Sequence, residues 1–553
     1  MKKFLVVGLL LLFWSGQARS QKLSFPGSRI SPEVITPHTA WAKPWHSGSI
    51  RILALSAAAS TREIVELSQR MEADITCVPV PEVKKELPEV WSYLREKLKE
   101  PYELILAGSL RWSDLPEDIR QTVLEKVNSG VSFLFVDPQA LDRRLYEVFE
   151  AGRSSQAGSD AAFIIPFEKL PAFGRFKTPG ELISRYVAES TAGKGKLCFL
   201  SYASGRGQYL FLTPAGPSNQ LEYDYYCAFV VRTILSLTGK LSAERLTEIR
   251  LEKDRVVLKT TSEQPGQVLL RVRDRSGESE YEKVVPFSSQ SVSLSLPRLT
   301  AGTHFVDAFL KRAGAIVDWR SCALEVPAAG EIKISLEKEG YLPGEIVSGK
   351  VEVSGLPGTG LKLTLSDSWG RVVESKVLPF STAAIFNLSQ FQPVTVLHYL
   401  RAELLEGKDV LLSQEISFPV RLRFDPKEFF FLIWGGPTPE YLPRYLLKLV
   451  RQAGVDGLFS RCDDWETLKE IASYNLYANP YIYSLKTASA GKDLARHPCF
   501  SDPAFRERMA SALQQKAVIV APFAPITYGL GDENELSHWS ENRDFCFSPH
   551  CLT

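Results

Sequence analysis

The 553-residue sequence has almost no net charge, few cysteines and, beyond its first residues, no long hydrophobic run. Its 65 Lys and Arg residues nearly balance its 64 Asp and Glu residues, so the formal net charge is only +1. This balance provides no overall basic field, and we expect no nucleic acid or anionic membrane surface as a partner. No later stretch reaches the roughly 20 apolar residues that span a bilayer, so we expect no stable membrane insertion.

Cysteine is scarce, at eight residues. Cys198 and Cys227 lie within apolar runs, which is typical of buried thiols that pack as small hydrophobic groups. The cysteines near the C-terminus lie in more polar surroundings and are considered below.

The first twenty residues have the pattern of a signal peptide. Lys2 and Lys3 precede an apolar segment, residues 4–14, and small residues at Ala18 and Ser20 offer cleavage sites. An uncleaved anchor is the alternative, but eleven apolar residues are too few to span a bilayer. We therefore expect residues 1–20 to be removed and the protein to be exported to the periplasm or the extracellular space, with residues 21–48 as a linker.

A chain of this length exceeds what one hydrophobic core supports, so we expect several domains. Residues 49–240 alternate buried strands, such as "IRILALSA" and "VSFLFVDP", with helical segments, and end in an amphipathic helix near 222–239. This order predicts an α/β domain with a parallel sheet covered by helices. In "SDLPEDIRQTVLEKVNSG" we expect Ser113 or Asp114 to cap the helix and Gly130 to end it.

Between 241 and 425 the helical period is absent, and short alternating segments are separated by turn residues. The pattern predicts two β-sandwiches, at 241–328 and 329–425. Trp319 or Trp369 could serve as a stacking platform for a sugar, although single tryptophans of sandwiches are more often part of the core.

From 428 the chain returns to strand and helix. Four strand–helix steps follow, the last strand being in "APITYGLGDE", and they predict the first half of an eight-stranded (β/α)8 TIM barrel. Such barrels place their active sites at the carboxyl ends of the strands. The side chains expected there are Trp434, Arg461, Asp463, Tyr483, Asp532 and Glu533. Aromatic, cationic and acidic groups around one opening suit an oligosaccharide or polysaccharide.

Residues 49–240, and in particular "YELILAGSLRWSDLPEDIRQTVLEKVNSGVSFLFVDP", resemble the flavodoxin-like glutamine-amidotransferase fold, especially the catalytically silent copies that accompany glycoside hydrolases. Active amidotransferases carry a nucleophilic cysteine on a turn after a strand, and "VSFLFVDPQAL" has none. The resemblance therefore implies a non-catalytic scaffold or a surface for homo-oligomer formation. The two sandwiches resemble immunoglobulin-like modules.

The final segment resembles the N-terminal half of the barrel of family 42 β-galactosidases, on the residues "YGLGDENELS". That family is a group of retaining glycoside hydrolases with an Asn-Glu pair after strand four, the Glu being the acid/base. By its distance from the strand Glu533 matches this acid/base. Glu535, preceded by an Asn, is the alternative. Asp532 then takes the place of the family's Asn and would contact a sugar hydroxyl.

The resemblance also implies a limit on activity. A complete barrel has about 250 residues, whereas about 125 follow position 428, and the family's nucleophile comes from strand seven. We therefore expect a truncated barrel and a chain that is inactive alone. The alternative is a non-catalytic protein that binds glycans or forms oligomers.

The same family has a cysteine cluster that can hold zinc. Cys499, Cys546 and Cys551 match three of its positions, Ser548 stands at the remaining one, and His550 could complete the site. The reaction requires no cofactor, so the zinc would be structural. A disulfide in the exported protein, or buried thiols, remain open as alternatives.

Overall fold

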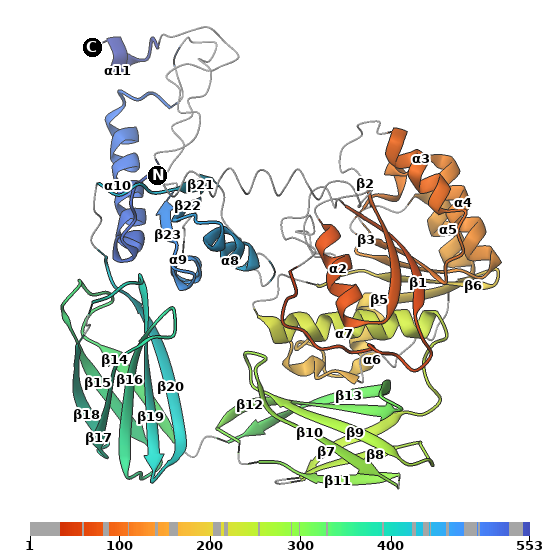
Figure 1. Ribbon diagram of the computed structural model, residues 1–553. Coiled ribbons are helices and arrows are strands. Elements are labelled where there is room, and N and C mark those ends of the chain that lie inside the picture. The colour runs from red at the N-terminus through yellow and green to blue at the C-terminus, as the bar shows by residue number, and fades with distance from the viewer. Residues whose placement is uncertain are drawn as a thin grey trace, which may run out of the picture. The chain divides into compact units, whose positions relative to one another are not determined.

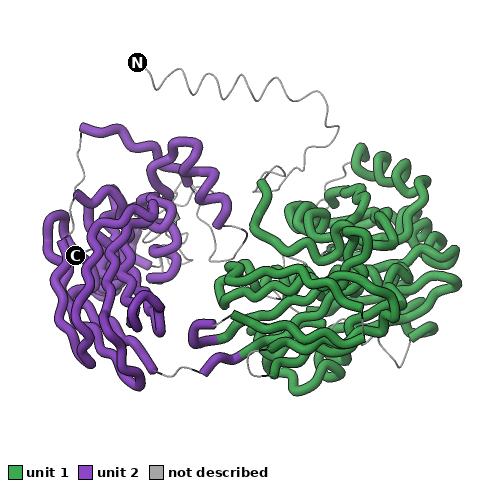
Figure 2. The backbone as a smooth tube through the Cα atoms, turned by 60° about the horizontal axis from the view of Figure 1, so that its bottom comes forward, with its two compact units in different colours: residues 1–298, 303–324 green, residues 299–302, 325–553 purple. Residues whose placement is uncertain are grey.

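The computed structural model divides the chain into two compact units, residues 1–298 with 303–324 and residues 299–302 with 325–553 (Figure 2). The protein is multidomain and rich in β-sheet, as the sequence predicted. The structure describes residues 34–552 apart from 58–59, 81–87, 109, 139–141, 154–163, 203–211, 215–218, 253–254, 289, 298, 328–329, 390–391, 423–426, 435–441, 443, 461–463, 481–494, 496–497 and 530–545.

The first unit begins with a six-stranded sheet of order β2-β1-β3-β4-β6-β5, in which only β5 is antiparallel to its neighbour (Figure 1). Every residue of the central strands β3 and β4 is buried. Such continuous apolar strands form parallel sheets because helices cover both faces. The strands are β1 (Ile50–Ala57), β2 (Ala73–Val80), β3 (Leu104–Gly108), β4 (Ser132–Val136), β5 (Val187–Ala192) and β6 (Gly195–Leu200).

The helices cover the sheet on both faces. Ile64 and Leu67 of α2 share one core with residues of α6 and α7, whereas Ile119 and Val123 of α4 share the other core with α3 and α5. The predicted parallel sheet covered by helices is therefore present. The helices are α2 (Thr61–Arg70), α3 (Pro88–Lys97), α4 (Glu117–Ser129), α5 (Arg143–Ala151), α6 (Pro179–Tyr186) and α7 (Gln220–Leu237).

The start of α4 differs from the prediction. Neither Ser113 nor Asp114 caps the helix, because both belong to a short 3-10 turn and Pro116 occupies the N-cap position. The turn follows from Trp112, which is buried beside Phe133 with ring centroids 5.6 Å apart. The helix ends at Gly130 as predicted, with a φ of 122° that favours glycine.

Helix α7 also differs, because it is not amphipathic: 15 of its 18 residues are buried. The reason is that the first β-sandwich covers the side of α7 that lies away from the sheet (Figure 1). The Tyr225 hydroxyl donates to Asp307 Oδ1 at 2.7 Å, and Arg232 pairs with Asp318 in the sandwich. A helix that is apolar on all sides belongs in the interior of a large unit.

A buried network of charges joins α2, α7 and the sandwich. The Asp224 carboxylate of α7 accepts from Arg70 Nε at 2.9 Å and from Arg273 Nη1 at 3.1 Å. Arg273 Nε lies 2.9 Å from Asp307 Oδ2. All four side chains are at most 2% exposed. Charges removed from water in this way are tolerated only when each has its partners.

Residues 34–48 pack against both parts of the first unit. Trp41 is fully buried, and its Nε1 donates to the Asp224 carbonyl oxygen at 3.0 Å. Its ring lies 6.0 Å from that of Trp319. Trp319 is therefore a core residue without exposed surface, which excludes it as a sugar platform.

The first sandwich consists of a four-stranded sheet, β10-β9-β12-β13, and a three-stranded sheet, β11-β8-β7. Short segments of alternating polarity form it, as the sequence predicted. The strands are β7 (Leu246–Glu252), β8 (Arg255–Thr260), β9 (Gly266–Arg273), β10 (Ser279–Phe287), β11 (Ser291–Ser295), β12 (Gly302–Arg312) and β13 (Ala315–Val326).

The second unit begins with another sandwich, of sheets β14-β15-β18 and β17-β16-β19-β20. Leu361, Leu363 and Leu365 of β16 alternate with more exposed residues and are fully buried. The turn after β16 leaves Trp369 62% exposed. The strands are β14 (Glu331–Leu336), β15 (Ile346–Ser354), β16 (Gly360–Asp367), β17 (Val372–Pro379), β18 (Ala383–Ser389), β19 (Leu397–Glu406) and β20 (Asp409–Pro419).

The rest of the second unit alternates strand and helix. Its three strands are parallel and lie in the order β21-β22-β23, with a helix after each (Figure 1). Asp502 caps α10, and its side chain accepts from the backbone N–H of Ala504. The elements are β21 (Leu432–Trp434), α8 (Arg444–Gln452), β22 (Gly457–Ser460), α9 (Trp465–Ser473), β23 (Tyr477–Pro480), α10 (Pro503–Val520) and α11 (Pro549–Leu552). None of the helices in the described part of the chain is long and apolar enough to cross a membrane.

His398 is a buried titratable group in the second sandwich. The side chain lies on β19 without exposed surface, and neither ring nitrogen has a hydrogen-bond partner among the described residues. Burial lowers the pKa of His398 from 6.5 to about 4, even though the nearby Asp367 acts to raise it. The ring is therefore neutral in the folded protein at neutral pH.

We predict that Asp224→Ala destabilises the first unit by about 3–5 kcal/mol, because it leaves two buried guanidinium groups without their shared partner. Amide hydrogen exchange of α7 in the full chain reports this loss. Asp118→Ala is the control, since Asp118 pairs with Arg95 on the surface and exposed pairs contribute little. Equal loss of α7 protection in the two variants would contradict the prediction.

We predict that the second sandwich loses about 3 kcal/mol of stability through His398 as the pH falls from above 6.5 to below about 4. In this window the unfolded chain binds a proton at the imidazole that the folded chain does not, so stability rises with pH. Urea denaturation at a series of pH values measures the effect. His398→Leu should show a correspondingly smaller pH dependence, and an unchanged slope in that variant would refute the assignment.

Candidate functional site

The carboxyl ends of β21, β22 and β23 lie at one edge of their sheet because the strands are parallel. Trp434, the last residue of β21, is 62% exposed at this edge. Its ring stacks on Phe459 of β22, with centroids 5.9 Å apart and an interplanar angle of 27°. The exposed Trp434 ring, with the half-buried Phe459 ring behind it, offers an aromatic surface of the kind on which the apolar face of a sugar ring can stack.

A fourth segment lies beside β23. The backbone N–H of Gly529 donates to the Pro480 carbonyl oxygen at 2.8 Å. The Asn479 side chain holds the preceding residues, since its Oδ1 accepts from the backbone N–H groups of Ile526 and Thr527 at 3.0 and 3.1 Å. The chain therefore passes next to β23 just before the acidic stretch that begins at Asp532.

Asn479 is a positioning residue that sequence reasoning missed. It is fully buried in β23, and its Nδ2 donates to the Leu458 carbonyl oxygen at 3.3 Å. The sequence contained one indication of this role, a polar amide next to a proline within the apolar run "LYANPYIY". A buried amide needs hydrogen-bond partners, so an Asn in such a run is expected to bind neighbouring backbone groups.

Of the side chains predicted at the strand ends, Trp434 is the one that the described residues include. The other predicted contacts of the sugar and both candidate acid/base residues lie outside the described residues, so their positions stay predictions: Arg461, Asp463, Tyr483, Asp532, Glu533 and Glu535.

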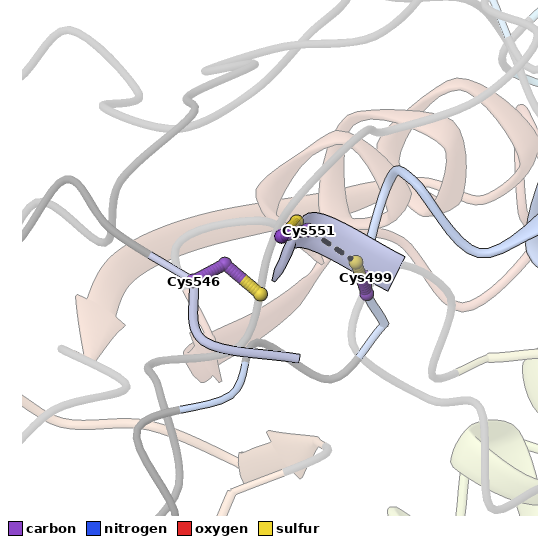
Figure 3. Close-up of side chains that lie close together, drawn as sticks. All are labelled: Cys499, Cys546 and Cys551. Carbon is purple, nitrogen blue, oxygen red and sulfur yellow. Dashed lines mark hydrogen bonds between the residues drawn. The ribbon is translucent and has the colours of Figure 1, made fainter. Parts of the chain in front are cut away.

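Three of the four predicted metal ligands lie together. The sulfurs of Cys499, Cys546 and Cys551 are all within 4.8 Å of one another (Figure 3). Cys499 is buried and Cys551 is exposed on α11. The Ser548 hydroxyl donates to the Cys499 sulfur at 2.9 Å. Two segments about 50 residues apart in sequence therefore lie side by side at these three sulfur atoms.

His550 does not join this group. Its Nε2 lies 3.7 Å from Asp502 Oδ1, the carboxylate that caps α10. The prediction that His550 completes a Cys3His site is therefore not supported by the geometry. The physical reason is that the short helix α11 directs His550 and Cys551 to different neighbours.

The three sulfurs fit a zinc ion. Zinc–sulfur bonds are about 2.3 Å long, so tetrahedral thiolate ligands lie about 3.8 Å apart. The Cys499 and Cys551 sulfurs are 3.5 Å apart, close to that spacing and well beyond the roughly 2.0 Å of a disulfide bond. The cluster can therefore supply three thiolates, and a fourth ligand would come from another group or from water.

Comparison with known proteins gives structural likeness but no family. No protein-family profile matches the chain, and no curated protein matches it. Among solved structures, β-glucuronidase 3 of Bacteroides uniformis matches 53% of the chain at 12% identity, with a TM-score of 0.22, and a β-glucuronidase of Ruminococcus gnavus matches 51% at 9% identity, with a TM-score of 0.21. The FN1–FN3 domains of chicken CNTN1 match 32% at 7% identity, with a TM-score of 0.14.

The chain spans only part of such proteins. It covers 48% of the length of a tetra-tandem repeat from a large adhesion protein, at 16% identity and a TM-score of 0.17, and 44% of the Bacteroides enzyme.

We predict that the full chain binds Co²⁺, used as a spectroscopic substitute for zinc, with a thiolate-to-metal absorption band. Cys499→Ser should weaken binding by at least about tenfold, since removal of even an outer-shell partner has an effect of that size. His550→Ala is the control and should bind as the unaltered chain does, because His550 contacts Asp502 instead. The absence of the band, or an equal loss in both variants, would show that no such site exists.

Proposed function

We propose that residues 428–553 belong to a glycoside hydrolase of the β-galactosidase type that acts on an oligosaccharide or polysaccharide. The observation that carries the proposal is the aromatic surface of Trp434 and Phe459 at the carboxyl edge of a parallel sheet. The alternation of strands and helices around it supports the proposal of a (β/α)8 barrel, a fold whose active sites form at this edge.

Glu533 is the proposed acid/base, with Glu535 as the alternative. The hydrogen bond between Gly529 and Pro480 supports this choice, because it holds the chain beside β23 four residues before Glu533. Protonation of the leaving oxygen requires a carboxylic acid within reach of the glycosidic bond. Asp532, Arg461, Asp463 and Tyr483 are the proposed contacts of the sugar hydroxyls.

The retaining reaction needs a second carboxylate about 5–5.5 Å from the first. The resemblance to family 42 places it on a seventh strand, whereas the proposed acid/base follows the fourth. We therefore propose that the 553-residue chain binds glycans but does not hydrolyse them by itself. Export by a signal peptide and a structural zinc at the three cysteines belong to the same proposal.

A non-catalytic glycan-binding protein is the second candidate, and Trp369 favours it. This side chain is 62% exposed in a turn of the second sandwich, where the Asp367 carboxylate accepts from two backbone N–H groups and orders the turn.

A scaffold role for the amidotransferase-like domain, including homo-oligomer formation, fits the turn after β4, which carries Asp137 in place of a nucleophilic cysteine.

We predict that Trp434→Ala weakens binding of β-galacto-oligosaccharides to the full chain by at least about fivefold. This factor corresponds to the binding free energy that one aromatic contact contributes. Isothermal titration calorimetry measures this. Trp369→Ala is the matched control, since both indoles are equally exposed. If only Trp369→Ala weakens binding, the second candidate is correct.

The same preparation tests for catalysis. We expect no release of p-nitrophenol from p-nitrophenyl β-galactoside, because one carboxylate cannot both protonate the leaving group and form the glycosyl intermediate. Release of p-nitrophenol that disappears in Glu533→Gln would disprove the proposed inactivity while confirming the acid/base.

A further inference from the structure

A second site is indicated in the first unit, at the carboxyl edge of the six-stranded sheet. Strands β1 and β3 are neighbours, but the helices that follow them lie on opposite faces: α2 contributes to one core and α4 to the other. Sheets of this kind bind ligands in the crevice where the chain changes face, outside the carboxyl ends of the strands.

Within the described part of this edge, three buried hydroxyl groups have no hydrogen-bond partner. They are Ser60 Oγ, three residues after β1, Tyr202 Oη, two residues after β6, and Thr213 Oγ1. Their side chains are at most 5% exposed. Ser60 occupies the N-cap position of α2 and yet makes no capping hydrogen bond. A buried hydroxyl without a partner is costly, so three at one edge call for a ligand.

Two of the three hydroxyls are linked through the chain to the buried carboxylate of Glu63. Ser60 precedes Glu63 by three residues on α2, which places both on one side of the helix. Thr213 follows Leu212, whose backbone N–H donates to Glu63 Oε2 at 2.9 Å. Tyr202 lies at the same carboxyl edge, two residues after β6, and its ring centroid is 5.6 Å from that of Tyr186.

The strands that precede Ser60 and Tyr202 are not neighbours in the sheet. Strands β1 and β6 are separated by β3 and β4, so they are three strand spacings, about 14 Å, apart. A ligand of several heavy atoms would span this width and reach both Ser60 and Tyr202.

Among the described residues, the charges near the site disfavour an anion. Glu63 accepts hydrogen bonds and repels negative charge. The two described cations of α2 are already engaged: Arg62 pairs with Glu66, and Arg70 pairs with Glu66 and Asp224. Hydroxyls that donate and accept, next to a carboxylate that only accepts, match a neutral ligand with many O–H groups.

We propose that the carboxyl edge at the switch between β1 and β3 binds a small neutral polyol, held by Ser60, Glu63, Tyr202 and Thr213. This site is independent of the strand-end site of the second unit, because all four residues belong to the first unit.

The test is isothermal titration of the full chain with D-glucitol and D-gluconate, a neutral and an anionic polyol of equal length. Neither has an anomeric carbon, so neither is a glycosidase substrate. We expect saturable binding of D-glucitol and at least tenfold weaker binding of D-gluconate. Tyr202→Phe and Thr213→Val should each weaken D-glucitol binding about threefold to tenfold. This factor corresponds to the net free energy that one hydrogen bond contributes to binding.

Tyr226→Phe is the matched control, since its hydroxyl already accepts from the backbone N–H of Ala172 at 3.2 Å. This variant should bind D-glucitol normally and melt at a lower temperature than the unaltered chain. Without polyol, Tyr202→Phe should melt no lower than the unaltered chain, because it removes a hydroxyl without a partner. Trp434→Ala should leave D-glucitol binding unchanged, so a failure of the proposed glycosidase site does not affect this result.

Three outcomes overturn the proposal. Absence of saturable D-glucitol binding means that the hydroxyls contact only water. Equal D-glucitol affinity of Tyr202→Phe and the unaltered chain places the ligand elsewhere. D-Gluconate affinity equal to or above that of D-glucitol refutes the neutral ligand.

Discussion

The carboxylate of Asp224 is the point on which the first unit depends. It accepts from Arg70 of α2 and Arg273 of the first sandwich while its own helix, α7, runs between sheet and sandwich. Because a buried ion is tolerated only with its partners in place, the α/β sheet and the sandwich have to fold together. The buried Trp41 adds its indole N–H to the same residue, so residues 34–48 become part of this core.

This constraint explains why the first sandwich and the second differ in their surroundings. In the first sandwich, Trp319 and Asp307 are buried against α7, so neither side chain is available to a ligand. The second keeps Trp369 exposed in a turn. The same kind of sheet pair thus acts as a covering layer in one unit and leaves an aromatic side chain available in the other.

The two proposed ligand sites lie at the carboxyl edges of parallel sheets for the same physical reason. At these edges the strands end together, and the loops that follow bring polar side chains from distant positions into one place. In the second unit the result is an aromatic surface at Trp434. In the first unit it is the group of Ser60, Tyr202 and Thr213, whose buried hydroxyls have no hydrogen-bond partner among the described residues and which we propose to bind a polyol.

The sequence by itself determined the elements. Period and turn residues predicted β1, the end of α4 at Gly130 and the alternating strands of both sandwiches, because these depend on local preference and burial. The resemblance to a known family predicted that Cys499, Cys546 and Cys551 form a cluster, and in the structure their sulfurs lie together. Only the tertiary structure decided that α7 is buried on all sides and that His550 contacts Asp502. The pattern of one element cannot reveal which distant element will cover it or pair with its charges.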